Sequence, residues 1–194
     1  MTKHVLLAFG LLISICATAQ DKKWSVEANY PISVGDELGN DNPAIIDLGI
    51  KYRFTKLGII DIGAGLNAGV FRDEIQVALL EESFDFNETN WLIQPKVFAE
   101  IQIPALSKLR PFVSVGYTVI TSKFDGDFPG LNAGVSDSST DGGFNFGVGV
   151  SFDVTKNFFI LVQYDYVRNS IGIDGLPDIK QDLGYFKIGV GYRF

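Results

Sequence analysis

Apolar and polar residues alternate along most of the chain with a period of two. At the start of this pattern, Trp24, Val26 and Ala28 alternate with Ser25 and Glu27. Because neighbouring side chains of a strand point to opposite faces, the alternation predicts strands with one apolar and one polar face. Eight such segments follow one another: residues 24–34, 46–54, 60–70, 91–103, 113–122, 144–154, 158–166 and 186–194.

The connections between these segments alternate between short and long. The short ones are residues 55–57, 104–110 and 155–157, and the long ones are residues 35–43, 72–90, 125–143 and 169–182. In the second long one, Ile75, Val77 and Leu79 are also compatible with an extension of the preceding strand, and Ile75, Leu79 and Glu82 with a helical turn. The long connections are acidic, as in the second, which carries Asp73, Glu74, Glu81, Glu82, Asp85 and Glu88. The short ends carry Lys22, Lys23, Lys56, Lys108, Arg110 and Lys156. An even number of strands with short turns at one end and long loops at the other is typical of outer-membrane barrels.

The two faces of the predicted strands differ in bulk and charge. One row is bulky and nearly free of charge, as a lipid-facing surface must be. The other is rich in Gly, Ser and Asn and carries charges of both signs: Glu27, Asp47, Asp61, Glu100, Asp153, Asp165, Lys51, Arg53, Lys96, Lys187 and Arg193. Eight strands enclose an interior just wide enough for side chains to fill. We therefore predict an all-β fold, an eight-stranded antiparallel transmembrane β-barrel.

Aromatic residues gather at the two ends of the segments. Those near the short turns are Trp24, Tyr52, Phe54, Phe152, Phe158, Tyr192 and Phe194. Those nearer the long loops are Tyr30, Phe71, Trp91, Phe144, Tyr164, Tyr166 and Phe186. Their placement predicts two girdles at the membrane interfaces.

One residue conflicts with a regular ladder. Pro95 lies inside the fourth segment and has no backbone N–H to donate, and a closed barrel has no edge strand to accommodate it. A β-bulge or a locally broken pair is therefore expected at Pro95.

The first residues have the features of a secretory signal peptide. Lys3 and His4 form a basic start, residues 5–15 are apolar, and Ala17-Thr18-Ala19 offers a cleavage site. We expect a signal peptide over residues 1–19, cleaved after Ala19, and a barrel domain over residues 20–194. The apolar run is too short to cross a bilayer as a helix, and no run of about 18 apolar residues occurs elsewhere. A lipoprotein anchor at Cys16 is disfavoured because Ile15, which precedes it, is not small.

Cleavage would leave a mature chain without cysteine or histidine. The single Cys and the single His of the sequence both precede residue 20, and the remaining 15 basic and 23 acidic residues give a net charge of −8. A Ser-His-Asp triad would be impossible, and zinc and haem would lack their usual ligands. The acidic balance disfavours nucleic acid as a partner. We therefore expect no enzymatic activity, no catalytic, cofactor-binding or metal-binding residues, and no cofactor.

A few motifs nevertheless have a chemical interpretation. Asp125-Gly126-Asp127 and the acidic second loop offer oxygen ligands to Ca²⁺ or Mg²⁺, although solvated acidic loops are commoner. Glu27 and Glu100 are candidates for a carboxylate pair, but partners of Lys51, Arg53 or Arg193 are a stronger interpretation. The motifs Gly147-x-Gly149 and Gly189-x-Gly191 lie within strands, so they indicate relief of crowding inside the barrel rather than nucleotide binding.

The final segment carries a family resemblance. Phe186-x-Ile188-x-Val190-x-Tyr192-x-Phe194, which ends on a terminal Phe, resembles the C-terminal signature of outer-membrane barrel proteins. With the eight-segment layout, residues 20–194 resemble the outer-membrane β-barrel domain family of OmpA/OmpX-like small barrels, a porin-family group. The resemblance implies location in the bacterial outer membrane, contact with its lipid and lipopolysaccharide, and recognition of the last strand by the barrel-insertion machinery.

Three functions are compatible with these observations. The favoured one is a non-enzymatic outer-membrane barrel with a structural role or a surface-binding role through its long acidic loops. An alternative is a narrow pore or solute channel, in which the inward charges would line water rather than pair. A second alternative is a soluble, lipocalin-like barrel that binds an apolar ligand, with the bulky row turned inward.

Overall fold

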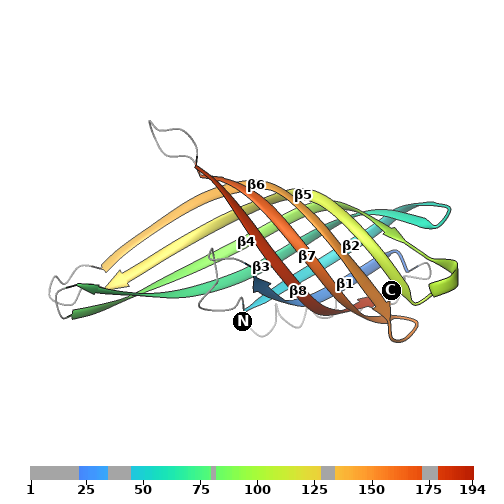
Figure 1. Ribbon diagram of the computed structural model, residues 1–194, viewed down its shortest axis with the longest axis horizontal. Coiled ribbons are helices and arrows are strands. Elements are labelled where there is room, and N and C mark those ends of the chain that lie inside the picture. Colours follow the sequence, from blue (N-terminus) through green and yellow to red (C-terminus); the bar gives the residue numbers. More distant parts are fainter. Residues whose placement is uncertain (1–21, 35–44, 80–81, 128–133, 172–178) are drawn as a thin grey trace, which may run out of the picture.

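Eight strands form one closed antiparallel barrel in the computed structural model (Figure 1). The structure describes residues 22–34, 45–79, 82–127, 134–171 and 179–194, with the side chains of 22–34, 45–72, 88–123, 137–170 and 180–194. The predicted signal peptide therefore lies outside the described residues. The strands are β1 (Trp24–Ser33), β2 (Ile46–Leu57), β3 (Ile60–Leu79), β4 (Glu82–Ile101), β5 (Leu109–Asp127), β6 (Gly134–Asp153), β7 (Phe158–Ile171) and β8 (Ile179–Arg193).

The barrel closes through the pairing of β1 with β8. Their register runs from Ser25↔Arg193 to Ser33↔Tyr185. Beyond it, Trp24 and Phe194 exchange backbone hydrogen bonds of 3.1 and 3.0 Å. In a closed barrel, every strand has a neighbour on both sides to which its backbone N–H and C=O groups can hydrogen-bond. A sheet that spans a membrane requires this, because lipid offers no hydrogen-bond partners. The described residues include no helix long and apolar enough to cross a membrane.

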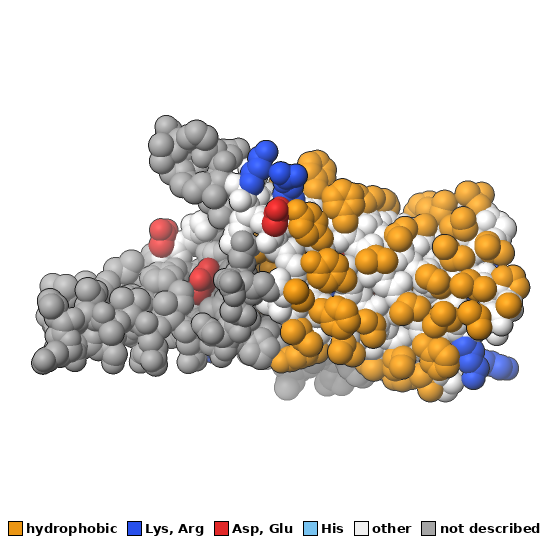
Figure 2. All heavy atoms as spheres, in the orientation of Figure 1, with side chains coloured by type: hydrophobic (Ala, Val, Ile, Leu, Met, Phe, Trp, Pro, Cys, Tyr) orange, Lys and Arg blue, Asp and Glu red, His pale blue; other side chains and the backbone are white. Residues whose placement is uncertain are grey.

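The apolar row of each strand faces outward and the polar row faces inward. Val113, Phe144 and Ile188 are 57%, 66% and 50% exposed, whereas Asp47, Asn67 and Lys187 are at most 2% exposed. Figure 2 shows the outward row as a broad hydrophobic band, with charged side chains at or beyond its borders. The soluble, lipocalin-like alternative required the bulky row to point inward, so the structure argues against it.

The short turns lie together at one end of the barrel, to the right in Figure 1. The first is tighter than predicted: β2 continues through residues 55–57, and the turn is Gly58-Ile59. Gly58 has a φ of 62°, whereas φ at Ile59 is not positive, which is the pattern of a type II′ hairpin turn. The second contains the 3₁₀ helix η1 (Pro104–Leu106). In the third, the Thr155 hydroxyl accepts a hydrogen bond of 3.0 Å from the Phe158 amide.

Much of what the sequence predicted as long loops is strand. β3 and β4 pair through Leu79↔Glu82, and β5 and β6 pair through Asp127↔Gly134. The prediction of a loop over residues 125–143 was therefore wrong for most of its length. Over residues 72–90, the alternative that Ile75, Val77 and Leu79 extend the third strand is confirmed, and the helical turn is not found. β4 and β5 stay paired as far as Phe86↔Gly126, so the two hairpins form a four-stranded sheet that extends beyond the barrel wall (left in Figure 1).

Among the described strand pairs, the register is irregular at two places. At Pro95 the ladder between β4 and β5 lacks two pairs, but Lys96↔Gly116 resumes the register of Ile93↔Val119. A broken pair, and not a bulge, accommodates Pro95 there. The β-bulge lies instead between Arg53 and Thr55, where Phe54 is the extra residue.

Two of the aromatic residues assigned to the girdles are buried. Phe71 is 2% exposed because it lies on the inward row of β3. Phe194 is 4% exposed and follows the last residue of β8, so the alternation of that strand no longer fixes its direction. Others point outward as predicted, including Trp91 and Tyr192 at 51% and 45% exposure.

Candidate functional site

The interior of the barrel is filled in layers that follow one another along every strand. On β4, the inward side chains from the short-turn end are Glu100, Phe98, Lys96, Gln94 and Leu92. All five are at most 5% exposed. Glu100 belongs to an arginine layer and Phe98 to an aromatic layer. Lys96 and Gln94 belong to a central polar cluster, and Leu92 belongs to an outer apolar layer.

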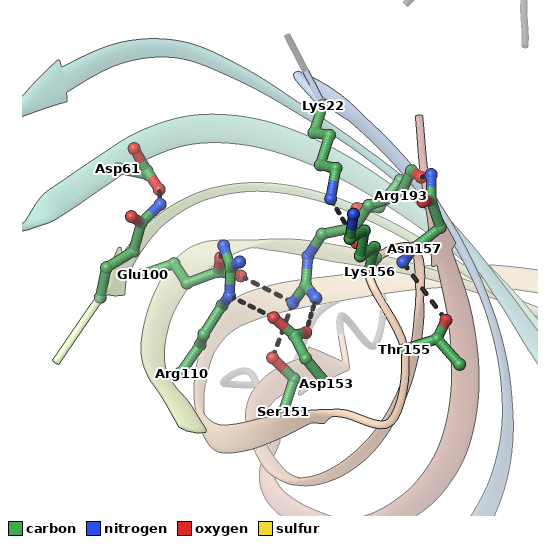
Figure 3. Close-up of polar contacts among 12 residues, drawn as sticks. Lys22, Asp61, Glu100, Arg110, Ser151, Asp153, Thr155, Lys156, Asn157 and Arg193 are labelled. Carbon is green, nitrogen blue, oxygen red and sulfur yellow. Dashed lines mark hydrogen bonds and ion pairs between the residues drawn. The ribbon is translucent and has the colours of Figure 1, made fainter. Parts of the chain in front are cut away.

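The arginine layer lies at the short-turn end and consists of Arg53, Arg110, Arg193, Glu100 and Asp153. Arg53 binds Glu100 at 3.0 Å, and Arg110 reaches Glu100 at 3.3 Å and Asp153 at 2.9 Å. Arg193 contacts both carboxylates and donates to the Ser151 hydroxyl at 2.8 Å, as Figure 3 shows. Three guanidinium groups share two carboxylates, so the layer keeps one positive charge in excess.

The aromatic layer separates the arginines from the centre of the barrel. It consists of Phe98, Phe112, Phe159 and Leu161, each at most 4% exposed. The Arg193 guanidinium lies 3.9 Å from the centroid of the Phe159 ring, and the Lys51 ammonium lies 4.3 Å from that of Phe112. These cation–π contacts let charged side chains pack against an apolar layer. Lys51 also binds Glu27 at 2.8 Å.

The central cluster is organised around Lys187. Its ammonium lies 3.0 Å from Asp47, 2.8 Å from Asp165 and 3.0 Å from the side-chain oxygen of Gln94, which matches its three donors. Lys96 lies 3.7 Å from Asp165. Two lysines and two aspartates give the cluster a net charge of zero. Such complete pairing is what makes buried charges tolerable in a low-dielectric interior.

Neutral amides complete the central cluster. Asn29 and Asn67 donate to the second oxygen of Asp47 at 2.8 and 2.7 Å. Gln94 donates to the Thr118 hydroxyl at 3.0 Å, across the gap that Pro95 leaves in the ladder. The side chains of β4 and β5 thus remain connected where their backbones are not paired.

The outer layer is apolar and faces the long hairpins. Its six members come from five strands and are at most 4% exposed: Phe71, Leu92, Ile120, Val167, Leu183 and Tyr185. The rings of Phe71 and Tyr185 lie 5.0 Å apart between centroids. This layer covers the central cluster on the side of the long hairpins.

Inward glycines leave room for the large side chains. A Cβ at Gly191 would collide with the ring of Phe159, and one at Gly149 would approach the ring of Phe112. A Cβ at Gly147 would approach the side chains of Ser114 and Asp165. Both glycine motifs therefore act as the sequence predicted, by relieving crowding.

The candidate carboxylate pair is divided between separate ion pairs. Glu27 binds Lys51, and Glu100 binds all three guanidinium groups of the arginine layer. The interpretation as structural partners is therefore confirmed. The side chains of Asp125 and Asp127 lie outside the described residues, and within the described part of the chain no three His, Cys, Asp or Glu side chains gather as metal ligands.

Sequence reasoning missed the apolar residues on the inward face. Leu92, Phe112, Phe159 and Leu161 all occupy inward positions of their strands. The signal was present as a run of apolar residues on both faces of residues 158–162. A strand whose two faces are both apolar is buried on both sides, here by lipid and by the barrel interior.

Comparison with solved structures supports this architecture. The barrel is similar to Ail, the attachment invasion locus protein of Yersinia pestis in complex with the heparin analogue sucrose octasulfate, with 18% identity and a TM-score of 0.54 over 88% of this chain and 96% of that one. It is similar to the N-terminal barrel domain of OprF from Pseudomonas aeruginosa, with 18% identity and a TM-score of 0.55 over the same shares. A major outer membrane protein from Thermus thermophilus shares 14% identity and a TM-score of 0.54 over 88% and 98% of the two chains. At these identities the likeness concerns the fold.

No curated protein matches the sequence. The family model for the outer membrane protein beta-barrel domain matches residues 5–194, nearly the whole chain. The outward apolar band, the closed ladder and the polar interior are the features that such a domain needs in an outer membrane. The chain therefore belongs to the outer membrane protein beta-barrel domain family and is located in the bacterial outer membrane.

Proposed function

We propose that this protein is a non-enzymatic outer-membrane barrel that does not conduct and that acts through the end carrying its long hairpins. The filled interior is the observation that carries the proposal. The aromatic and outer apolar layers cross the interior on either side of a central cluster whose lysines and aspartates form ion pairs with no net charge. Water and ions would have to displace both layers to pass.

The proposed working surface is the four-stranded extension of β3, β4, β5 and β6. Its hairpins are paired to their last described residues, so they project as sheet rather than as separate loops. Outer-membrane barrels place such extensions outside the cell, with their short turns in the periplasm. Near the base of the extension, the Tyr166 hydroxyl donates to Asp182 at 2.6 Å, and Arg168 lies 4.0 Å from the same carboxylate. The proposed role is therefore surface contact or reinforcement of the membrane.

Export belongs to the same proposal. Residues 1–19 would direct the chain out of the cytoplasm and be removed after Ala19. The C-terminal strand, β8, would then be recognised by the insertion machinery. Mass measurement of protein extracted from the outer membrane tests the first step, and a mature chain beginning elsewhere than residue 20 would correct it.

Single-channel recording in planar bilayers tests the closed interior. Folded protein should add no large, stable conductance. A stable conductance would favour the narrow-pore alternative, and replacing Arg53 or Lys96 by Gln should then change the ion selectivity. The recordings require folded protein. Folding is verified by heat-dependent electrophoretic mobility in detergent, which is typical of a folded barrel.

A further inference from the structure

The short-turn end of the barrel contains a pocket with a mainly basic lining. It has a volume of about 280 Å³, and five of its nine lining residues are Lys or Arg. These five are Lys22, Lys23, Arg53, Lys56 and Arg110, and the one acidic lining residue is Asp61. A concave site lined mainly by one sign of charge concentrates ligands of the opposite sign.

Two of the lysines direct their ammonium groups at neutral oxygens. Lys56 donates to the side-chain oxygen of Gln102 at 2.9 Å. Lys22 donates to the backbone carbonyl of Lys156, as Figure 3 shows. Neither lysine forms an ion pair with any described residue. Within the part of the chain that the structure describes, their charges therefore have no direct carboxylate partner.

The one carboxylate of the lining is engaged elsewhere. Asp61 is 6% exposed and accepts a hydrogen bond from the amide nitrogen of Gln102. That contact fixes the orientation of Gln102 and leaves its oxygen for Lys56. Asp61 thus positions a neutral acceptor and does not pair with the lysines.

The floor of the pocket is rigid and also positive. Arg53 is 7% exposed and is held by Glu100 at 3.0 Å and by the Ser25 hydroxyl at 3.2 Å. Arg53 and Arg110 belong to the arginine layer, which has one positive charge in excess. A preorganised cation loses little conformational entropy when an anion binds.

One side of the pocket reaches the lipid-facing surface. Phe54, the extra residue of the bulge, keeps the outward direction of the even positions of β2, and its ring is 53% exposed. Leu57 in the same strand is 60% exposed. The pocket therefore combines basic groups with an apolar wall at the edge of the hydrophobic band. A ligand with a phosphate group attached to acyl chains satisfies both parts.

We propose that this pocket binds the headgroup phosphate of an anionic phospholipid in the periplasmic leaflet of the outer membrane. Lys22 and Lys56 bind the phosphate, Arg53 contributes positive charge from the floor, and the acyl chains lie along Phe54. The leaflet follows from the short turns, which face the periplasm in this family of barrels. Lipid binding at this pocket does not depend on whether the barrel interior conducts ions.

Lipid retention measured by native mass spectrometry tests the proposal. Mature protein folded in a zwitterionic detergent is titrated with phosphatidylglycerol or with phosphatidylcholine of the same chains. Phosphatidylglycerol should bind more tightly. The double variant Lys22→Gln/Lys56→Gln should bind phosphatidylglycerol about 25-fold more weakly, since each basic side chain at an anionic surface contributes a factor of about five to the affinity. Binding of phosphatidylcholine should weaken much less, because its choline group offsets the charge of the phosphate.

The control is Lys108→Gln, which removes one charge at the same end of the barrel but outside the pocket and is compared with the single variant Lys56→Gln. Unchanged phosphatidylglycerol binding in the double variant would overturn the proposal. Equal weakening by Lys108→Gln would also overturn it, because it would indicate general surface charge. Competition by inorganic phosphate as effective as that by phosphatidylglycerol would assign the pocket to free phosphate and not to a lipid. Heat-dependent mobility of each variant verifies that it is folded.

Discussion

The central cluster and the arginine layer are both built from ion pairs, but they differ in redundancy and enclosure. In the central cluster, Lys187 is the one cation that contacts Asp47 among the described residues, and apolar layers lie on both sides. In the arginine layer, Glu100 contacts three guanidinium groups, and Arg110 is partly exposed. Enclosure makes a lost partner costly, whereas redundancy makes it tolerable. The same kind of interaction, a buried ion pair, is therefore expected to stabilise the two regions to different extents.

The largest effect is expected from Lys187→Met. The substitution leaves the buried Asp47 without a cationic partner, and breaking a buried pair in this way costs about 3–5 kcal/mol. Urea unfolding in lipid vesicles measures the free energy of unfolding. Lys180→Met is the matched control, because Lys180 lies on the same strand and is exposed. Equal losses in the two variants would show that the enclosure of the central cluster has no energetic consequence.

A smaller loss is expected when the outer apolar layer is opened. Leu92→Ala removes an inward side chain that is 4% exposed, and the cavity it leaves costs about 3 kcal/mol. Ile93→Ala removes a neighbouring side chain that is 50% exposed to the lipid side, where lipid refills the space, so about 1 kcal/mol is expected. Unfolding of both variants in the same vesicles measures the difference. A larger loss for Ile93→Ala would contradict the assigned faces of β4.

Adding one methyl group to the aromatic layer should have a moderate effect. Gly191→Ala forces its Cβ against the ring of Phe159, and overpacking of this kind costs about 1–3 kcal/mol. Gly69→Ala is the control, because its Cβ would meet the nearest atom at 3.4 Å, an ordinary contact. Thermal unfolding in detergent measures both. If Gly69→Ala is the more harmful, the packing of the aromatic layer is not the cause.

The smallest effect is expected from Arg110→Ala. Glu100 keeps Arg53 and Arg193 as partners, and the lost pairs are partly exposed, so a cost of about 1 kcal/mol is expected. High salt should reduce the difference from the unchanged protein, because salt screens partly exposed pairs more than enclosed ones. Urea unfolding with and without added salt measures it. A loss as large as that of Lys187→Met would remove the distinction between the two clusters.

The pattern of alternation predicted the fold because side-chain direction in a strand is a local property. The alternation of apolar and polar positions predicted the eight strands and their antiparallel order. It also predicted that Lys51 and Asp47 face inward and that Val113 faces outward, because odd and even positions of a strand point to opposite faces. The prediction failed where an apolar residue occupies an inward position, as Phe71 does. It also failed where a strand ends, as at Phe194. The prediction also made β3 to β6 too short. Polar residues favour loops, but they are equally compatible with a sheet that projects into water.

The sequence alone determined which polar residues are available inside the barrel and which apolar rows contact lipid. It could not determine which inward groups meet, because Lys187 and Asp47 are 140 residues apart in the chain and lie together only after β1 pairs with β8. Register sets the height of each inward side chain, and closure brings the first strands against the last. The layers, the basic pocket and the bulge at Phe54 are therefore products of the tertiary structure, since each depends on pairings between strands that alternation within one strand does not encode.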